Sequence, residues 1–310
     1  MRSRRLIALS VAVVVTGILA GCTAGADAPS DPAVPPPVDV CDSAAPSGAT
    51  SESIQVDGAV GSPASVSFAA PLTITSTERT VVVEGGGAPV DGSNLVDYAA
   101  TVFDAATGEL LQQQEYDERA MLPAAAATVG QFVGCATVGS RIVVAVPETD
   151  QAGASVWVLD VLDTLPSAAT GRDQKPVDGM PTVSLAEGGA PTITIPGGEP
   201  AAETRVAVLK KGDGATVAPG DTVMVQYSGV RWSDGEVFDS SWSKGAPAAL
   251  VTTNVISGYK PALEGQTVGS QVLVVIPPDE AYGEGEINED DLTGETLVFV
   301  VDILATQPTM

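Results

Sequence analysis

The side chains that could do chemistry lie in the last third of the chain. Residues 223–227 alternate like a half-buried strand that ends in Tyr227, and a turn at Asp234-Gly235 leads to Phe238 and Asp239. A phenol, an aromatic ring and a carboxylate close together can form an apolar hollow with a polar edge, which suits a small ligand. An ordinary amphipathic hairpin has the same pattern, so both interpretations stay open at this point.

The composition excludes several kinds of catalysis. The chain has no histidine, and its three cysteines are Cys22, Cys41 and Cys135. Histidine-based acid–base chemistry, Ser-His-Asp triads and histidine metal sites are therefore excluded. The acids of residues 284–291 could hold a hard cation, but their order does not match a calcium loop and a solvated face is favoured. We expect neither a metal nor another cofactor.

Four blocks, in order, resemble the FK506-binding-protein (FKBP) type of peptidyl-prolyl cis-trans isomerase. The resemblance covers residues 203–306. The blocks are Tyr227-Ser228-Gly229 with Asp234-Gly235 and Phe238-Asp239-Ser240-Ser241, then Val255-Ile256-Ser257-Gly258-Tyr259, then Ala281-Tyr282-Gly283, and finally the closing strand from Thr296 to Leu304.

This resemblance implies rotation of the bond before proline, a reaction that breaks no bond and has a barrier of ~18–20 kcal/mol. It implies Tyr259 as the floor of an aromatic cup, the Ile256 N–H and the Tyr282 hydroxyl as donors, and Asp239 as a polar edge held by Tyr227. The implied catalytic residues are Tyr227, Phe238, Asp239, Tyr282 and Phe299, and the implied substrate-binding residues are Val255, Ile256, Tyr259 and Leu292. Val255 and Phe299 would also suit a plain core.

Two departures from the family pattern affect the rim. The family has an aromatic residue before the Val-Ile segment, where this chain has only residues 246–250, Ala-Pro-Ala-Ala-Leu. The family's Ile-Pro-Pro stretch is replaced by residues 289–293, in which Leu292 is the apolar residue. Both leave the expected fold intact, but they put catalytic efficiency and macrolide affinity in doubt.

The second half of the chain is expected to be α+β, a twisted antiparallel sheet wrapped on one short helix. The strand candidates are residues 206–209, 222–230, 272–276 and 296–304. The helix candidate is residues 259–264, with Pro261 tolerable only in the first turn and Gly265 ending it.

The first half resembles the second, which predicts two tandem FKBP-like domains. Thr137-Val138-Gly139-Ser140 parallels Thr267-Val268-Gly269-Ser270, Asp97-Tyr98 is matched to Gln226-Tyr227, and Leu111-Gln112 stands where the second copy has Phe238-Asp239. No Ala-Tyr-Gly occurs in the first copy, so we expect it to have lost the site. The predicted domains are residues 51–165 and 182–310, joined by a linker at residues 166–181.

The N-terminus predicts export. Arg2, Arg4 and Arg5 precede an apolar run over residues 6–20, as in a secretory signal over residues 1–21. Leu19-Ala20-Gly21-Cys22 resembles a bacterial lipobox, which implies a lipid on Cys22 and anchoring to the outer face of the cell membrane; an ordinary cleaved signal is the alternative. Residues 22–50 are rich in Ala, Pro and Ser and predict a disordered tether.

The net charge limits the binding partners, and the cysteines limit the covalent links within the chain. Fourteen basic residues against 39 acidic ones give a net charge of −25, which repels nucleic acid and anionic lipid. In an exported protein Cys41 and Cys135 can form a disulfide, or can stay reduced. We expect a monomer.

Two functions remain from the sequence. One is a lipid-anchored isomerase that acts on proline-containing polypeptides, with FK506-like or rapamycin-like macrolides as candidate ligands. The other is a non-catalytic FKBP-like chaperone or binding module. The intact ring residues favour the first, and the altered first copy favours the second.

Overall fold

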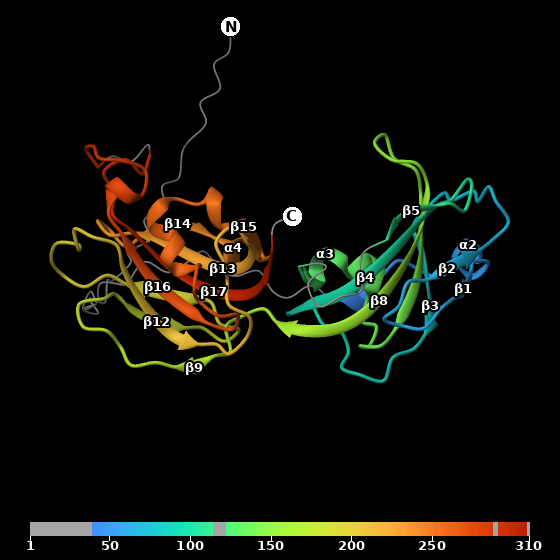
Figure 1. The fold of residues 1–310 in the computed structure, drawn as a ribbon, viewed down its shortest axis with the longest axis horizontal. Helices are drawn as coiled ribbons and strands as arrows, with labels where there is room; N and C mark the ends of the chain where they lie inside the picture. The colour runs from blue at the N-terminus through green and yellow to red at the C-terminus, as the bar shows by residue number, and fades with distance from the viewer. Residues whose placement is uncertain (1–38, 114–121, 288–290, 309–310) are drawn as a thin grey trace, which may run out of the picture.

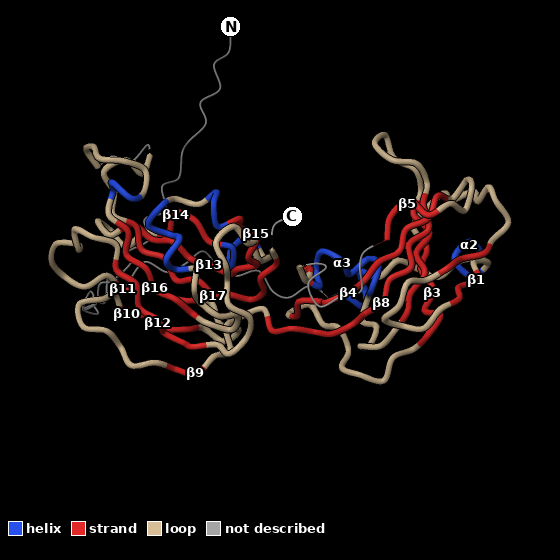
Figure 2. The backbone as a smooth tube through the Cα atoms, viewed as in Figure 1, coloured by secondary structure: helices blue, strands red, loops and turns tan. Residues whose placement is uncertain are grey.

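The computed structural model describes residues 39–113, 122–287 and 291–308. Figure 1 shows two β-rich lobes, here called the N-terminal lobe (residues 39–166) and the C-terminal lobe (residues 167–308). Strands predominate in both, and the helices are few and short (Figure 2). In the described part of the chain, no helix combines the length and the apolar character needed to cross a membrane. Cys22 and the predicted signal sequence, residues 1–21, lie outside the described residues.

The C-terminal lobe is built on one seven-stranded antiparallel sheet. Its strand order is β14-β13-β17-β16-β12-β9, with β15 paired to β13. The four predicted strands are all present, each one to three residues longer than predicted. The strands are β9 (Arg172–Asp173), β12 (Arg205–Lys211), β13 (Thr222–Arg231), β14 (Val237–Ser240), β15 (Ala248–Val251), β16 (Gln271–Ile276) and β17 (Leu297–Gln307).

The predicted helix at residues 259–264 is wrong in type and position. The chain there forms a 3₁₀ helix, η2 (Ser257–Ala262), in which Tyr259 N–H donates to the Ile256 carbonyl at 3.0 Å. Pro261 lies inside this helix and has no N–H to continue an α-helical ladder. Gly265 follows with φ +78°, as predicted for a terminating residue. The other short helices are α4 (Ser241–Lys244), η1 (Thr252–Asn254) and η3 (Pro278–Glu280).

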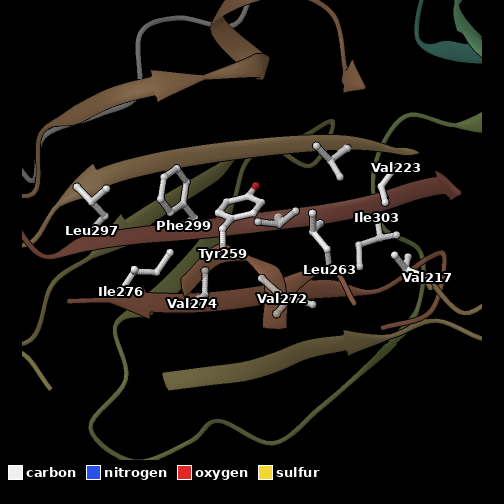
Figure 3. Close-up of a cluster of buried hydrophobic side chains, with 13 residues drawn as sticks. Val217, Val223, Tyr259, Leu263, Val272, Val274, Ile276, Leu297, Phe299 and Ile303 are labelled. Atoms are coloured by element: carbon white, nitrogen blue, oxygen red, sulfur yellow. The ribbon is translucent and has the colours of Figure 1, made fainter. Parts of the chain in front are cut away.

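Both faces of the C-terminal sheet are covered, which is why β17 is an almost continuous apolar strand. One face packs on η2 around Tyr259, Leu263 and Phe299, and Figure 3 shows this cluster. The other face is covered by a hairpin of β10 (Thr182–Leu185) and β11 (Pro191–Thr194), which brings Ile193 onto Leu273 and Val300. The only charged side chain among the first eight residues of β17 is Asp302.

The N-terminal lobe has a six-stranded antiparallel sheet in the order β3-β7-β8-β4-β5, with β6 paired to β4. A hairpin of β1 and β2 covers one face and α3 packs on the other. The elements are α1 (Val40–Ser43), α2 (Ala49–Glu52), β1 (Gln55–Asp57), β2 (Ser65–Ser67), β3 (Glu78–Val83), β4 (Asn94–Asp104), β5 (Leu110–Gln113), β6 (Ala124–Ala125), α3 (Ala126–Val133), β7 (Arg141–Val146) and β8 (Ser155–Pro166).

The sheet register corrects the match of Asp97-Tyr98 to Gln226-Tyr227. Tyr227 pairs with Val301 on β17, whereas Tyr98 pairs with Val161 on β8, one residue beyond the buried Asp160. In the C-terminal sheet the residue opposite the buried Asp302 is Gln226, and in the N-terminal sheet the residue opposite Asp160 is Ala99. Ala100 therefore holds the position that corresponds to Tyr227. The tyrosines were matched by residue type, which carries no information on register, and Tyr98 in fact corresponds to Val225.

Residues 39–50 differ from the predicted tether. Val40 is only 2% exposed and packs into the core that includes α3. Cys41 forms a disulfide with Cys135, just after α3, with their Cα atoms 4.8 Å apart. Composition alone indicated disorder here because proline and alanine dominate, but one buried valine and the disulfide fix this segment to the lobe.

The predicted linker at residues 166–181 is also largely part of a lobe. The Ala169 N–H donates to the Asp302 carboxylate at 2.8 Å, and β9 pairs with β12. A buried carboxylate needs donors, and the backbone of this segment supplies one. Only Ser167 and Ala168 separate the end of β8 from this attachment.

Candidate active site

Four aromatic rings converge on one face of the C-terminal sheet. Phe299 on β17 is the centre: the rings of Tyr259 and Phe238 meet it edge-on, with centroids 4.9 and 5.4 Å away, and the ring of Tyr227 lies at 6.4 Å. Edge-to-face contacts of this kind stabilise aromatic clusters. Figure 3 shows the rings of Phe299 and Tyr259 side by side above the sheet. We call the four side chains, Tyr227, Phe238, Tyr259 and Phe299, the cup.

The cup exists because one residue beside it has no side chain. A Cβ at Gly229 would lie 2.6 Å from Cε1 of Phe299 and 2.9 Å from Cζ of Phe238. Gly229 pairs with both Phe299 and Asp239, so it lies between the two strands that carry the rings. A glycine on β13 is therefore what leaves room for two rings.

The floor of the cup is held by close packing of η2. A Cβ at Gly258 would lie 2.3 Å from Cγ2 of Ile276, so the η2 backbone rests directly on β16. This contact positions the next residue, Tyr259, as the floor of the cup, with 4% of its surface exposed. The Val-Ile-Ser-Gly-Tyr spacing thus has a local structural cause.

The polar edge is a group of three side chains, two of them predicted. The Tyr227 hydroxyl donates to Oδ2 of Asp239 at 2.7 Å, and Lys244 Nζ contacts Oδ1 of Asp239. Lys244 also lies 3.5 Å from the Tyr227 hydroxyl and 5.9 Å from the centre of its ring. Lys244 was missed because it lies on α4, five residues beyond Asp239, and no sequence motif marks it.

These contacts fix the protonation of the polar edge. Partial burial alone would raise the pKa of Asp239, but hydrogen bonds from Lys244 and Tyr227 outweigh it and hold that pKa below 3.8. Burial and then the Asp239 carboxylate raise the pKa of Tyr227 above 10. At neutral pH the edge therefore consists of a carboxylate, a neutral phenol and an ammonium ion.

The remaining predicted residues differ in placement. Val255, Ile256 and Leu292 are half-buried and pack against the cluster that contains Tyr259. Among the described residues, none accepts a hydrogen bond from the Ile256 N–H. Tyr282 is different: its side chain is 56% exposed on the segment after η3 and is not a member of that cluster.

The wall that lacks the family's aromatic residue is formed by β15. Ala248 and Leu250 are half-buried against the cluster. Where the family has an aromatic ring, this wall is thus made of two aliphatic side chains. A separate hollow of about 420 Å³ lies on the opposite face of the sheet, between Met180, Leu185 and Leu209.

Comparison with known proteins points to one family. Residues 214–304 match the family described as FKBP-type peptidyl-prolyl cis-trans isomerase. A protein of Streptomyces anulatus named FK506-binding protein is 40% identical over 118 residues, which span 37% of this chain and 95% of that protein. The probable FK506-binding protein of Corynebacterium glutamicum is 36% identical over 115 residues, 37% of this chain and 97% of that protein. FkpA of Escherichia coli, an FKBP-type peptidyl-prolyl cis-trans isomerase, is 35% identical over 101 residues, 33% of this chain and 37% of that protein.

Proposed function

This chain belongs to the FKBP-type peptidyl-prolyl cis-trans isomerases, and from that premise we propose that its cup isomerises X-Pro bonds in exported polypeptides. The observation that carries the proposal is the enclosure of the cup. Phe299 and Tyr259 are 6% and 4% exposed, and Phe238 and Tyr227 form the more accessible sides. A prolyl ring bound there would be removed from contact with water.

The mechanism needs only this geometry. Resonance keeps the X-Pro bond planar, and uncatalysed rotation takes roughly 10–100 s at 25 °C. The cup removes water from the imide and favours the twisted bond over the planar one, and the Ile256 N–H and the Tyr282 hydroxyl serve as donors to the bound chain. Asp239, held by Tyr227 and Lys244, sets the polar edge. Each ~1.4 kcal/mol of preference for the twisted state is worth tenfold in rate.

A proline-limited refolding assay tests this proposal. The purified protein should speed the slow refolding phase of a client, and Phe238→Ala should reduce that effect at least tenfold because one side of the cup is lost. Phe132→Ala, at a phenylalanine that is also half-buried but lies on α3 of the N-terminal lobe, is the matched control and should keep the rate. Equal refolding rates with and without the wild-type protein would refute the proposal.

The N-terminal lobe is proposed to be a second FKBP-like unit. Three register shifts in its sheet, at Val81/Val83, Asp97/Tyr98 and Val102/Phe103, fall 127 positions before those of the C-terminal sheet. Side-chain hydrogen bonds repeat as well: Thr137 donates to the Gly85 carbonyl as Thr267 donates to the Gly212 carbonyl, both at 2.7 Å. Such agreement supports an ancestral duplication.

In this lobe the residues that correspond to the cup cannot form one. Ala100 corresponds to Tyr227, Leu111 to Phe238 and Gln112 to Asp239. Val102 corresponds to Gly229, so a branched side chain occupies the space that the rings need. The proposal therefore assigns all isomerase activity to the C-terminal lobe, and residual activity in a protein with an inactivated cup would contradict it.

A second role, binding of unfolded clients without catalysis, is favoured by one observation. Leu110 and Leu111 on the edge strand β5 are 53% and 59% exposed. An apolar edge strand can pair with an extended chain. Leu110→Lys with Leu111→Lys should weaken suppression of client aggregation and leave isomerase activity unchanged. Unaltered suppression would contradict this role.

The proposed location is the outer face of the cell membrane, with a lipid on Cys22. The Cys41–Cys135 disulfide supports an oxidising compartment. The wild-type protein should take up labelled fatty acid and fractionate with membranes, and Cys22→Ser should do neither. Failure of the wild-type protein to take up label would refute the anchor.

A macrolide of the FK506 or rapamycin type is a proposed ligand of the same cup. The β15 wall is thin at Ala248, so affinity should be low. Ala248→Phe should tighten binding, which titration calorimetry would measure. Tight binding by the wild-type protein would contradict the argument from the wall.

A further inference from the structure

The Tyr259 hydroxyl is a buried polar group that the free protein does not satisfy. Its side chain is 4% exposed, and no described residue forms a hydrogen bond with the hydroxyl oxygen. Most buried polar atoms in proteins have a partner, because a buried donor that loses water and gains nothing is costly. A residue whose only task was to be an apolar floor would not need this oxygen.

The hydroxyl belongs to the cup and not to the distant core. The ring of Tyr259 meets Phe299 edge-on, and Figure 3 shows the hydroxyl at the end of the ring away from the η2 backbone. The charged and polar groups that act on it are Tyr227 and Asp239. Neither the Asp239 carboxylate nor the Tyr227 hydroxyl forms a hydrogen bond with the Tyr259 hydroxyl, so the polar edge does not satisfy it.

This hydroxyl is suited to donate. Burial, followed by the proximity of Tyr227 and Asp239, raises the pKa of Tyr259 well above 10, so the phenol keeps its proton at neutral pH. A neutral phenol without an acceptor can bond to an oxygen that arrives with a ligand. The backbone carbonyl oxygens on either side of a prolyl ring are such acceptors. Proline itself has no N–H, so its carbonyl is the backbone group that it can offer.

We propose that Tyr259 is a substrate-binding donor, and that its hydroxyl bonds to a backbone carbonyl oxygen of the X-Pro segment in the cup. The proposal rests on the function proposed above. It gives the floor of the cup a polar contact in addition to its apolar surface. Because the bond forms in the planar ground state, it strengthens binding and does not speed rotation.

Tyr259→Phe tests this proposal, because it removes the oxygen and keeps the ring. KM for a proline peptide should rise about threefold to tenfold with kcat unchanged, as expected for loss of one hydrogen bond. The melting temperature should stay the same or rise by about 2–4 °C, because an unsatisfied buried donor disappears. A structural role alone would lower stability and leave KM unchanged.

Controls separate this proposal from the function itself. Tyr98→Phe changes a half-buried tyrosine of the N-terminal lobe and should alter neither KM nor kcat. Dissociation constants for the same peptide, measured by calorimetry, test Tyr259 even if the wild-type protein binds without catalysing. A Tyr259→Phe protein with unchanged affinity and KM would overturn the proposal, as would a change confined to kcat. Absence of both binding and catalysis in the wild-type protein would instead overturn the proposed function, and the Tyr259 assignment with it.

Discussion

The substitution Gly229→Ala adds a single carbon to the most crowded place beside the cup. Its Cβ would lie 2.6 and 2.8 Å from Cε1 and Cδ1 of Phe299, and 2.9 Å from Cζ of Phe238. Carbon atoms pack best at about 3.5–4.0 Å, so the rings would have to withdraw by about 1 Å. Phe299 cannot withdraw freely, because it lies on a central strand and Tyr259 packs against it.

The expected cost follows from this crowding. Overpacking of a well-packed site costs about 1–3 kcal/mol, so the free energy of unfolding should fall by that amount. Displacement of binding groups by about 1 Å can cost up to roughly a hundredfold in rate, so kcat/KM should fall between tenfold and a hundredfold. The loss of stability should lie toward the lower end of its range, because Phe238 is half-exposed and can move away from the cup.

The assay is proline-limited turnover combined with thermal unfolding. Gly197→Ala is the matched control, since a Cβ at Gly197 would meet no atom within 4 Å. The control should keep both activity and stability. If the folded Gly229→Ala protein kept its kcat/KM within about twofold, the argument that this glycine keeps the cup open would be wrong.

Three further predictions concern the rest of the molecule. Burial raises the pKa of Asp302 above 3.8 despite opposing hydrogen bonds, so the contribution of Asp302 to stability declines as pH rises from 3.8 through its folded-state pKa. Asp302→Asn should therefore make the melting temperature less dependent on pH over that range. The same pH dependence in the variant and the wild-type protein would contradict this. Replacing Cys41 and Cys135 together by serine opens a loop of 94 residues and should cost up to about 4.7 kcal/mol of unfolding free energy, with no loss if the disulfide does not form in solution. Arg141→Met leaves Asp160 buried without its 2.6 Å ion pair and should cost about 3–5 kcal/mol by chemical denaturation, whereas a neutral effect would show that water replaces the pair.

Local patterns accounted for most of the C-terminal lobe. The strands were found because β-branched residues alternate or run together where a sheet is buried, and the cup residues were found because the family spacing places them. Gly229 was part of a matched block, but its role as the space between two rings was not apparent. That role depends on a Cβ position, which no sequence pattern reports.

Predictions from the sequence were wrong for strand register and for segments that are held by contacts with distant residues. Tyr98 was matched to Tyr227 because both are tyrosines, but the strand pairing places Tyr98 at the position of Val225, two residues earlier. Residues 39–50 and 169–173 had the composition of tethers. They are ordered because Val40 is buried, Cys41 is bonded to Cys135, and Asp302 accepts the Ala169 N–H.

The sequence by itself determined which chemistry is excluded, where the strands lie and which rings belong to one site. The first two depend on residue type and short-range periodicity, which can be read along the chain, and the third came from the spacing shared with the family. The tertiary structure alone decided that Lys244 completes the polar edge and that the Tyr259 hydroxyl is enclosed without a partner. Burial and hydrogen-bond satisfaction depend on segments far apart in the chain that exclude water together, and that condition exists only once the sheet has closed on η2.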